Sequence, residues 1–245
     1  MKILLAPSET KAKGGESKLN LNSMLLPAIN DTRESLIDAY QDILNRADLK
    51  ELSKMFGLKK ESEIKEYILN IKNEPTLKAI QRYTGVAFDF LDYSSLNLKE
   101  QEYIENNVLI FSNLFGVVSA KDKIPLYRLK QGETIGEIRI DNIYNKALKE
   151  PLDELLEDED IIDLRAKYYE KFYKPSKKYT TLKFLKGGKV VSHWAKAYRG
   201  MVLRECAIKD VKTIDEFIKI EIKGLSIKEI LESKRKNEII YNIDI

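Results

Sequence analysis

Two cationic residues flank a glycine on a predicted helix, in the part of the sequence best suited to bind an anion. Lys196, Gly200 and Arg204 are spaced four residues apart, so on a helix they lie along one face. Arg199 adds a third cation beside them. A glycine within a helix costs about 1 kcal/mol relative to alanine, which indicates that something approaches the backbone closely there. The sequence leaves open whether that is an anion or another helix.

The surrounding segment, residues 164–209, is strongly basic. It carries a net charge of +11, whereas the whole chain carries +3 and the remainder therefore −8. A split of this size favours an anionic partner such as nucleic acid or a phosphorylated ligand. The same segment is rich in aromatic residues that can stack on bases: Tyr168, Tyr169, Phe172, Tyr173, Tyr179, Phe184, Trp194 and Tyr198. The alternative is that the cations form a solvated face and the aromatic rings fill the core.

A second candidate phosphate site lies in a helical region, at residues 52–60. Gly57 stands between two apolar residues with helical patterns on either side, and Lys59 and Lys60 follow it. This arrangement is similar to a helix-hairpin-helix, in which amides at the start of the second helix hold a phosphate without reading base sequence. That motif normally has a second glycine where this chain has Lys59. The alternative is an ordinary corner between two helices with a glycine C-cap.

Composition excludes several classes of protein. With a single cysteine, Cys206, and a single histidine, His193, the chain has no internal disulfide and no usual zinc cage, so we expect no metal site and no cofactor. A lone histidine is more often a packed or surface residue than a general acid or base. The apolar runs are too short to cross a membrane, and the first ends at Pro7, too early for a signal peptide. These features predict a cytoplasmic globular protein.

Apolar patterning predicts one α/β or α+β domain over residues 1–245, with a mixed sheet and a helical insertion at about 33–81. The loop after the first strand, residues 7–15, occupies a position where α/β proteins place their sites. The predicted strands are 2–6, 108–111, 135–140, 161–164, 181–185, 189–192, 219–222 and 238–243. The predicted helices of the insertion are 33–44, 49–55 and 62–71.

Five ordered motifs give the chain a resemblance to the YaaA peroxide-stress family, extending from about residue 2 to residue 225. They are Ala6-Pro-Ser-Glu-Thr10, Tyr83-Thr-Gly85, Leu114-Phe-Gly-Val117 with Asp122, Pro125-Leu-Tyr-Arg-Leu-Lys-Gln-Gly132 and Ala195-Lys-Ala-Tyr-Arg-Gly200. The resemblance implies a bacterial cytoplasmic protein of a single α/β fold, with a basic cleft and a helix-hairpin-helix. It also implies DNA binding and the limitation of free iron during hydrogen peroxide stress.

The chain departs from the family pattern at two motifs. The family's opening Ser-Pro-Ala-Lys-Thr has its lysine displaced here to Lys11 or Lys13, which puts a role for Lys11 in doubt. The family's Leu-Arg-Pro-Leu-Asp is here Val118-Ser-Ala-Lys-Asp122, so its arginine is missing and its aspartate remains. The residues carried over as cleft candidates are Tyr83, Asp122, Tyr127, Arg128, Lys196, Arg199 and Arg204.

The leading hypothesis is a stress protein that binds double-stranded or damaged DNA without sequence preference, through the basic segment, Arg128 and the hairpin at Gly57. We expect neither a membrane nor a protein partner. The alternative is an enzyme acting on a nucleotide or a DNA base, with Lys196 as nucleophile or anion clamp and Asp122 as acid or base. Direct sequestration of iron by the acidic stretch 157–163 is disfavoured, because consecutive carboxylates on a solvated turn chelate weakly.

Overall fold

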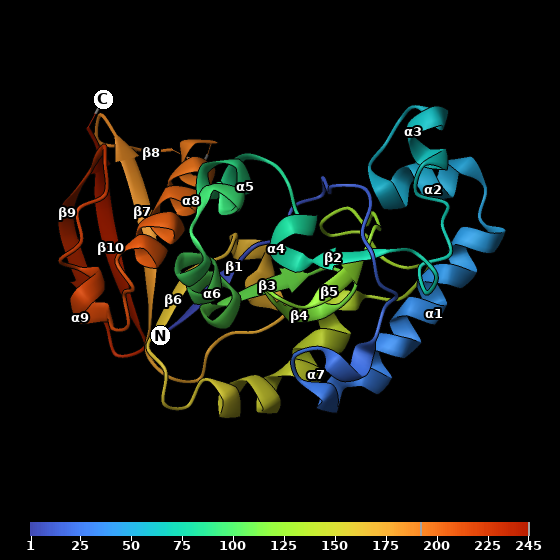
Figure 1. The fold of residues 1–245 in the computed structure, drawn as a ribbon, viewed down its shortest axis with the longest axis horizontal. Coiled ribbons are helices and arrows are strands. Elements are labelled where there is room, and N and C mark those ends of the chain that lie inside the picture. The colour runs from blue at the N-terminus through green and yellow to red at the C-terminus, as the bar shows by residue number, and fades with distance from the viewer. Residues whose placement is uncertain (192, 245) are drawn as a thin grey trace.

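A mostly parallel β-sheet with helices on both faces forms the centre of the protein (Figure 1). The computed structural model describes residues 1–191 and 193–244, and of His193 only the backbone. The strands are β1 (Lys2–Leu5), β2 (Thr76–Lys78), β3 (Val108–Ser112), β4 (Gly116–Ser119), β5 (Lys123–Pro125), β6 (Ile161–Leu164), β7 (Tyr179–Lys186), β8 (Lys189–Val190), β9 (Leu225–Glu232) and β10 (Lys236–Ile243). The α-helices are α1 (Asn30–Arg46), α2 (Leu49–Phe56), α3 (Glu61–Lys65), α4 (Ala79–Arg82), α5 (Val86–Leu91), α6 (Leu98–Asn107), α7 (Ile140–Leu155), α8 (His193–Ile208) and α9 (Ile214–Phe217). Four short 3₁₀ helices are η1 (Leu21–Ser23), η2 (Pro27–Ile29), η3 (Tyr93–Ser95) and η4 (Lys167–Lys171).

The strand order β4-β3-β1-β6-β7-β10-β9 places β1 between two parallel neighbours. Leu5, the last residue of β1, is in register with Ile110 of β3 and with Leu164 of β6. The strands β1, β3 and β6 are buried on both faces, as expected of parallel strands covered by helices. Because β3, β1, β6, β7 and β10 all run in the same direction, their carboxyl ends meet at one edge of the sheet.

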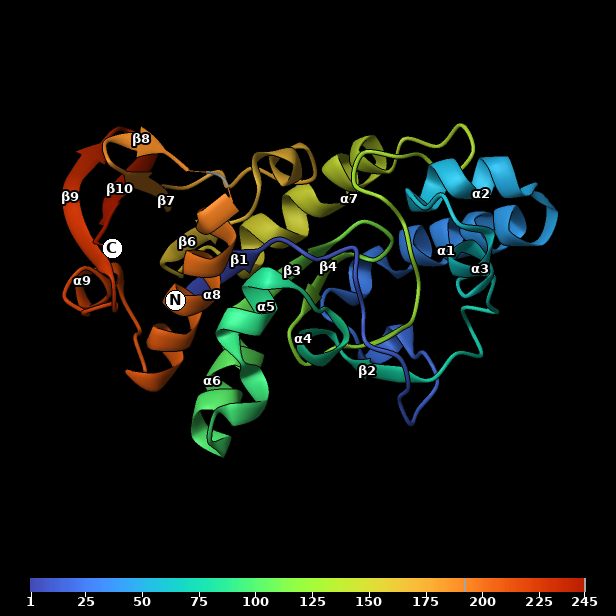
Figure 2. The ribbon, with the colours of Figure 1, turned by 90° about the horizontal axis from the view of Figure 1, so that it is seen from above.

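Helices cover both faces of this sheet and also form a lobe beside it (Figure 2). Helices α5, α6 and α8 lie on one face and α7 on the other, while α1, α2 and α3 form a separate lobe at one end of the molecule (Figure 2). A second, two-stranded sheet of β2 and β5 connects that lobe with the centre. All three helices predicted for the stretch 33–81 are present, but the first begins at Asn30 and the third ends at Lys65. This stretch also contains a strand, β2.

Two predicted strands are wrong. In the stretch 135–140, Ile135 and Ile138 form an isolated bridge about Gly136, whose φ of 57° reverses the chain, and α7 begins at Ile140. The stretch 219–222 forms only the bridge between Ile222 and Leu225. The strand in that region is β9, which the sequence reading missed: both of its faces are largely exposed, and its apolar alternation breaks after Lys228. The predicted strand at 189–192 is present as β8, and its last residue lies outside the described residues.

Gly200 is explained by helix packing. A Cβ atom at Gly200 would lie 2.1 Å from the carbonyl oxygen of Ala87 in α5. Helices α5 and α8 therefore cross backbone to backbone, which only glycine permits. Of the two readings that the sequence left open, the close approach of another helix is confirmed.

The aromatic residues of the basic segment mainly fill the core, as the alternative reading predicts. Six of the eight are buried, whereas Trp194 is 43% exposed. One of the cations, Arg165, is also buried, where it forms an ion pair of 2.7 Å with Asp163 and donates to two backbone carbonyls. The positive charge that reaches solvent therefore comes from fewer residues than the sequence count indicates.

Candidate functional site

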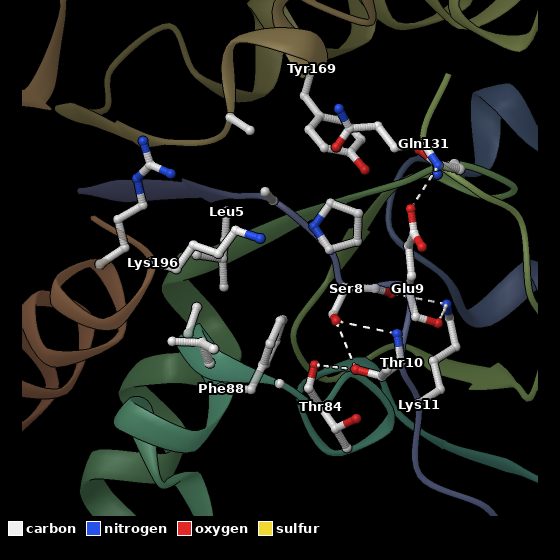
Figure 3. A pocket seen from close by; sticks show the side chains of 18 of the residues that line it. Leu5, Ser8, Glu9, Thr10, Lys11, Thr84, Phe88, Gln131, Tyr169 and Lys196 are labelled. Carbon is white, nitrogen blue, oxygen red and sulfur yellow. Dashed lines mark hydrogen bonds between the residues drawn. The ribbon is translucent and has the colours of Figure 1, made fainter. Parts of the chain in front are cut away.

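A cavity of about 410 Å³ opens at the carboxyl ends of β1, β3 and β6 (Figure 3). This is the position at which open α/β sheets bind ligands. Four cations line it against a single carboxylate, that of Glu9. The residues that line the cavity are Leu5, Ala6, Pro7, Ser8, Glu9, Thr10, Lys11, Thr84, Gly85, Val86, Ala87, Phe88, Asn113, Tyr127, Arg128, Leu129, Gln131, Leu164, Ala166, Tyr169, Lys196 and Arg199.

The loop after β1 forms one wall of the cavity and is held in place by a buried arginine. The Arg82 side chain is fully buried and donates to four backbone carbonyl oxygens. Two belong to the loop, those of Ala12 and of Gly14 (2.9 Å), and two lie outside it, those of Pro75 (2.7 Å) and Ile124 (3.1 Å). Burial lowers the pKa of Arg82 to about 10, so the guanidinium stays charged at neutral pH. Arg82 thus fixes the loop to the neighbouring β2–β5 sheet.

Lys11 lies in this wall, although its displacement from the family motif had put its role in doubt. Its Nζ donates to the carbonyl oxygens of Ser8 (3.0 Å) and Glu9 (3.4 Å). The same atom lies 4.1 Å from the centre of the Tyr127 ring and 5.1 Å from that of Tyr83. Burial, reinforced by the positive charge of Arg128, lowers the pKa of Lys11 to about 7. Lys13, the other candidate for the displaced lysine, is exposed and pairs with Glu66.

The lowered pKa of Lys11 predicts a specific pH dependence of stability. In the unfolded chain the lysine binds a proton up to a pH near 10.5, whereas in the native state it loses the proton near pH 7. The unfolded state therefore binds more protons between these values, so this residue adds stability as the pH rises above 7, by at most about 1.4 kcal/mol per pH unit. We expect the free energy of unfolding of the wild type to rise relative to that of Lys11→Met between pH 7 and pH 9, measured by urea denaturation. Lys13→Met is the control and should run parallel to the wild type, and a parallel Lys11→Met profile would contradict the assignment.

Two buried tyrosines stand behind Lys11. The Tyr83 and Tyr127 hydroxyls are 2.8 Å apart, and the Tyr127 hydroxyl is also 2.8 Å from Ser112 Oγ. Burial raises the pKa of Tyr127 to about 12 and that of Tyr83 well above its usual value. Both phenols are therefore neutral at physiological pH. Their rings form a rigid, weakly polar surface beneath the Lys11 amine. Of the two tyrosines, only Tyr127 lines the cavity.

Arg128 connects the cavity with the helical lobe. Its Nε donates to the carbonyl oxygen of Phe56, the last residue of α2 (2.8 Å), which satisfies one of the unpaired carbonyls at that helix end. Its Nη2 lies 3.4 Å from Glu9 Oε2. The other carboxylate oxygen of Glu9 accepts a hydrogen bond from the backbone N–H of Gln131 (3.2 Å). Arg128 thus lines the cavity and also joins the loop after β1 to the end of α2.

Lys196 and Arg199 reach the cavity from the opposite side. Lys196 is exposed on the first turns of α8 and lies across the cavity from Glu9 and Gln131 (Figure 3). Arg199 is half-buried, and burial lowers its pKa, with Asp163 acting in the opposite direction. Neither side chain forms an ion pair or a hydrogen bond with any residue that the structure describes. The two cations are therefore available to an anion.

Other candidate residues lie elsewhere. Asp122 does not line the cavity, and its Oδ2 accepts from the amides of Leu25 (3.0 Å) and Ser119 (2.9 Å). Arg204 donates to the carbonyl oxygens of Leu91 (2.8 Å) and Asp92 (3.1 Å), at the end of α5. The structure thus brings together Lys196, Arg199, Arg128 and Tyr127, but not Asp122 or Arg204.

The turn around Gly57 lies in the helical lobe, away from the cavity. Gly57 ends α2 with a φ of 66°, and its amide and that of Leu58 donate to the last carbonyls of the helix. A glycine C-cap is therefore present, as the alternative reading predicts. Lys59 and Lys60 follow it in exposed positions before α3 begins at Glu61, and Lys60 pairs with Glu63 at 3.4 Å. Phosphate binding at this turn stays a prediction.

The sequence reading did not select several polar residues of the cavity, and four of them bear on its chemistry. Glu9, Asn113, Gln131 and Tyr169 line it. Glu9 follows β1, Asn113 follows β3, and Tyr169 lies shortly after β6. The rule that sites gather at the carboxyl ends of parallel strands could have found these three, because all three strands were predicted. Gln131 lies within the family motif at residues 125–132, from which only Tyr127 and Arg128 were carried over.

The residues that the structure describes contain neither a membrane-spanning helix nor a cluster of metal ligands. No helix there is long and apolar enough to cross a membrane. Within the same residues no group of three or more His, Cys, Asp or Glu side chains is placed to hold a metal ion.

Comparison with known proteins supports the resemblance to the YaaA family over nearly the whole chain. The model of the family described as "Peroxide stress protein YaaA" matches residues 1–231. An uncharacterized protein of Campylobacter jejuni is 43% identical over 244 residues, covering 99% of each chain. A UPF0246 protein of Corynebacterium glutamicum is 31% identical over 242 residues, covering 94% of this chain and 95% of the relative. A further UPF0246 protein, from Fusobacterium nucleatum, is 27% identical over 245 residues, covering 96% of each chain. This chain therefore belongs to the YaaA family of peroxide stress proteins.

Proposed function

We propose that this protein binds double-stranded or damaged DNA without sequence preference during peroxide stress and thereby limits iron-mediated oxidative damage. The observation that carries the proposal is the charge of the cavity lining, in which Lys11, Arg128, Lys196 and Arg199 face only one carboxylate. Lys196 and Arg199 have no acidic partner among the described residues. When DNA binds, cations that lack counter-charges neutralise the phosphates of its backbone.

Further cations stand at the same edge of the sheet. The strands β6 and β7 are parallel, so the β7–β8 hairpin lies on the side where the cavity opens. Lys186 and Lys189 flank its glycine turn, and Lys186 Nζ lies 5.2 Å from the ring of the exposed Trp194. A basic surface with an exposed aromatic ring suits a nucleic acid. Because no element of residues 1–191 and 193–244 resembles a helix that reads base edges, we propose that phosphate contacts dominate binding.

The helical lobe supplies the second contact in this proposal. Lys59 and Lys60 lie after α2, at the end of the molecule remote from α8 (Figure 1). A duplex that reaches both Lys196 and this turn would pass over the cavity between them. We propose DNA binding rather than catalysis by Lys196 and Asp122, because Asp122 already accepts two backbone hydrogen bonds away from the cavity.

A salt series tests this proposal. Fluorescence anisotropy of a labelled duplex should show tight binding that weakens steeply with salt. We expect Lys196→Ala/Arg199→Ala to weaken binding to all duplex sequences alike and to lower the slope of log K against log salt by about two. Lys59→Ala/Lys60→Ala should lower the slope by a similar amount if the duplex spans both contacts.

The matched control is Lys99→Ala/Lys146→Ala, which removes the same charge from exposed positions on α6 and α7 outside the cavity lining. Its slope should stay close to that of the wild type. Equal losses in the control and in Lys196→Ala/Arg199→Ala would show that net charge alone governs binding, and an absence of binding at low salt would refute the proposal.

A further inference from the structure

The cavity at the strand ends is chemically divided along its length. Lys196 and Arg199 of α8, which have no ion-pair partner among the described residues, line one side. Across from Lys196 stand the polar side chains of Glu9, Gln131 and Tyr169 (Figure 3), and there the charge of Arg128 is paired with Glu9. Its volume of about 410 Å³ lies within the range of about 300–1,000 Å³ that is usual for small-molecule sites. A cavity of this size is far too small for a duplex, so DNA passing over it does not explain why it is there.

The side lined by Lys196 and Arg199 is suited to a phosphate. The Arg199 guanidinium is half-buried, yet it has no hydrogen-bond partner in the described part of the chain. Removing a guanidinium from water without a partner is costly, so an anion on this side would stabilise the Arg199 charge. Arginine matches phosphate through paired N–H donors, and the exposed Lys196 amine lies one helical turn away.

The opposite side carries groups that can recognise a nucleobase. Asn113 is 6% exposed, and its Oδ1 has no hydrogen-bond partner among the described residues, while its Nδ2 donates to the Leu129 carbonyl (3.0 Å). This oxygen is buried, so it can accept from a donor such as the amino group of a base only when the Asn113 side chain turns toward the cavity. The Gln131 side chain and the buried Tyr169 lie on the same side. Amide side chains of this type are regular partners of base edges.

Apolar surface joins the two sides. Leu5, Pro7 and Phe88 line the cavity, and the rings of Phe88 and Tyr169 lie on facing walls (Figure 3). Aromatic rings of this kind stack on bases irrespective of sequence. An anion site, an apolar middle and a buried amide at the far side correspond, in order, to the phosphate, the sugar and the base of one nucleotide.

We propose that this cavity binds a single nucleotide, with the phosphate at Arg199 and Lys196 and the base against Asn113, Gln131 and Tyr169. The nucleotide is either one extruded from a duplex held on the basic surface, as in enzymes that flip bases, or a free nucleoside monophosphate. The first source rests on the proposed function and the second does not.

Calorimetry of the full-length protein with free nucleotides tests the site itself. The probes are the four deoxynucleoside 5′-monophosphates, each compared with its nucleoside and with inorganic phosphate. We expect at least one monophosphate to bind about tenfold more tightly than its nucleoside. Arg199→Met should reduce that ratio to below about threefold. Tyr169→Phe, which removes only the hydroxyl, should weaken both molecules alike, by about tenfold if the hydroxyl bonds the base.

A duplex with a central 2-aminopurine tests the source of the nucleotide, since its fluorescence rises when the base leaves the stack. A rise on binding that Tyr169→Phe and a saturating monophosphate both diminish supports extrusion. If a monophosphate binds and both Arg199→Met and Tyr169→Phe have the effects stated above, but the fluorescence does not rise, the ligand is a free nucleotide. Thermal melting of Arg199→Met and Tyr169→Phe establishes that both variants are folded, and the Lys146→Ala variant should match the wild type in every nucleotide measurement.

The outcomes separate the two proposals. Duplex binding without any monophosphate binding or 2-aminopurine signal overturns the nucleotide site and leaves the proposed function standing. Monophosphate binding without duplex binding refutes the proposed function and keeps the site. Monophosphate binding that neither Arg199→Met nor Tyr169→Phe changes would show that the nucleotide binds elsewhere and overturn this inference.

Discussion

Replacing Arg82 by methionine lowers the free energy of unfolding by about 4 kcal/mol and the melting temperature by about 8 to 16 °C. Its guanidinium is fully buried and donates to four backbone carbonyl oxygens. Methionine fills a similar volume but cannot donate, so the carbonyls lose their partners, and each buried acceptor without a partner costs about 1–3 kcal/mol. The loss exceeds what a surface arginine would cause because water cannot replace the missing donors.

The measurement is urea denaturation of Arg82→Met beside Arg235→Met. Arg235 is exposed in the turn between β9 and β10, so its replacement removes the same charge and should change the stability by no more than about 0.5 kcal/mol. Because Arg82 fixes the loop that carries Glu9 and Lys11, we also expect the Arg82→Met variant to bind DNA more weakly below its melting temperature. A wild-type melting temperature for Arg82→Met would show that this network is not needed for the fold.

Replacing Gly200 by alanine destabilises the protein, although alanine is the better helix former. A helical glycine replaced by alanine gains about 1 kcal/mol when the position is free. At Gly200 the added Cβ would lie 2.1 Å from the Ala87 carbonyl oxygen and 3.0 Å from the Leu91 amide nitrogen. Both are backbone atoms of α5, so helix α5 or α8 must move as a whole. Overpacking of this kind costs about 1–3 kcal/mol, and more where the backbone shifts.

We therefore expect Gly200→Ala to lower the free energy of unfolding by about 2 kcal/mol net, and the melting temperature by about 4 to 8 °C. Differential scanning calorimetry measures both. Since α5 follows Thr84 and Gly85 of the cavity lining, a shift of this helix should also weaken ligand binding at the cavity. A melting temperature equal to or above that of the wild type would mean that helix propensity prevails and that α5 and α8 do not meet as closely as described.

The central strands could be predicted from the sequence because their signal is local. Runs such as Ile3 to Leu5 and Val108 to Phe111 are continuously apolar, as strands covered on both faces must be. The first two helices of the lobe followed from apolar spacing in the same way. The alternating apolar residues around Gly136 are typical of a strand, so a strand was predicted there, but the chain turns at this glycine. The exposed edge strand β9 has an interrupted apolar alternation and was missed.

The candidate site was predictable only in part. Lys196, Arg199, Arg128 and Tyr127 were found from the basic segment and from the family resemblance, and all four line the cavity. Asp122 was chosen on the same grounds, yet its carboxylate accepts hydrogen bonds from the backbone instead. A family motif identifies residues with a functional or structural role, but it does not distinguish a ligand-binding group from one that supports a turn.

The sequence by itself determined the α/β class, the order of the central strands along the chain, the family and the concentration of positive charge in residues 164–209. These depend on residue type and on spacing between near neighbours. Only the tertiary structure decided which cations are free: Arg165 pairs with Asp163 and Arg204 binds the end of α5, whereas Arg199 is left without a partner among the described residues. It also decided that Lys11 enters the cavity wall. The physical reason is that the partner of a polar group is set by contacts between segments far apart in the chain, over which residue patterning carries no information.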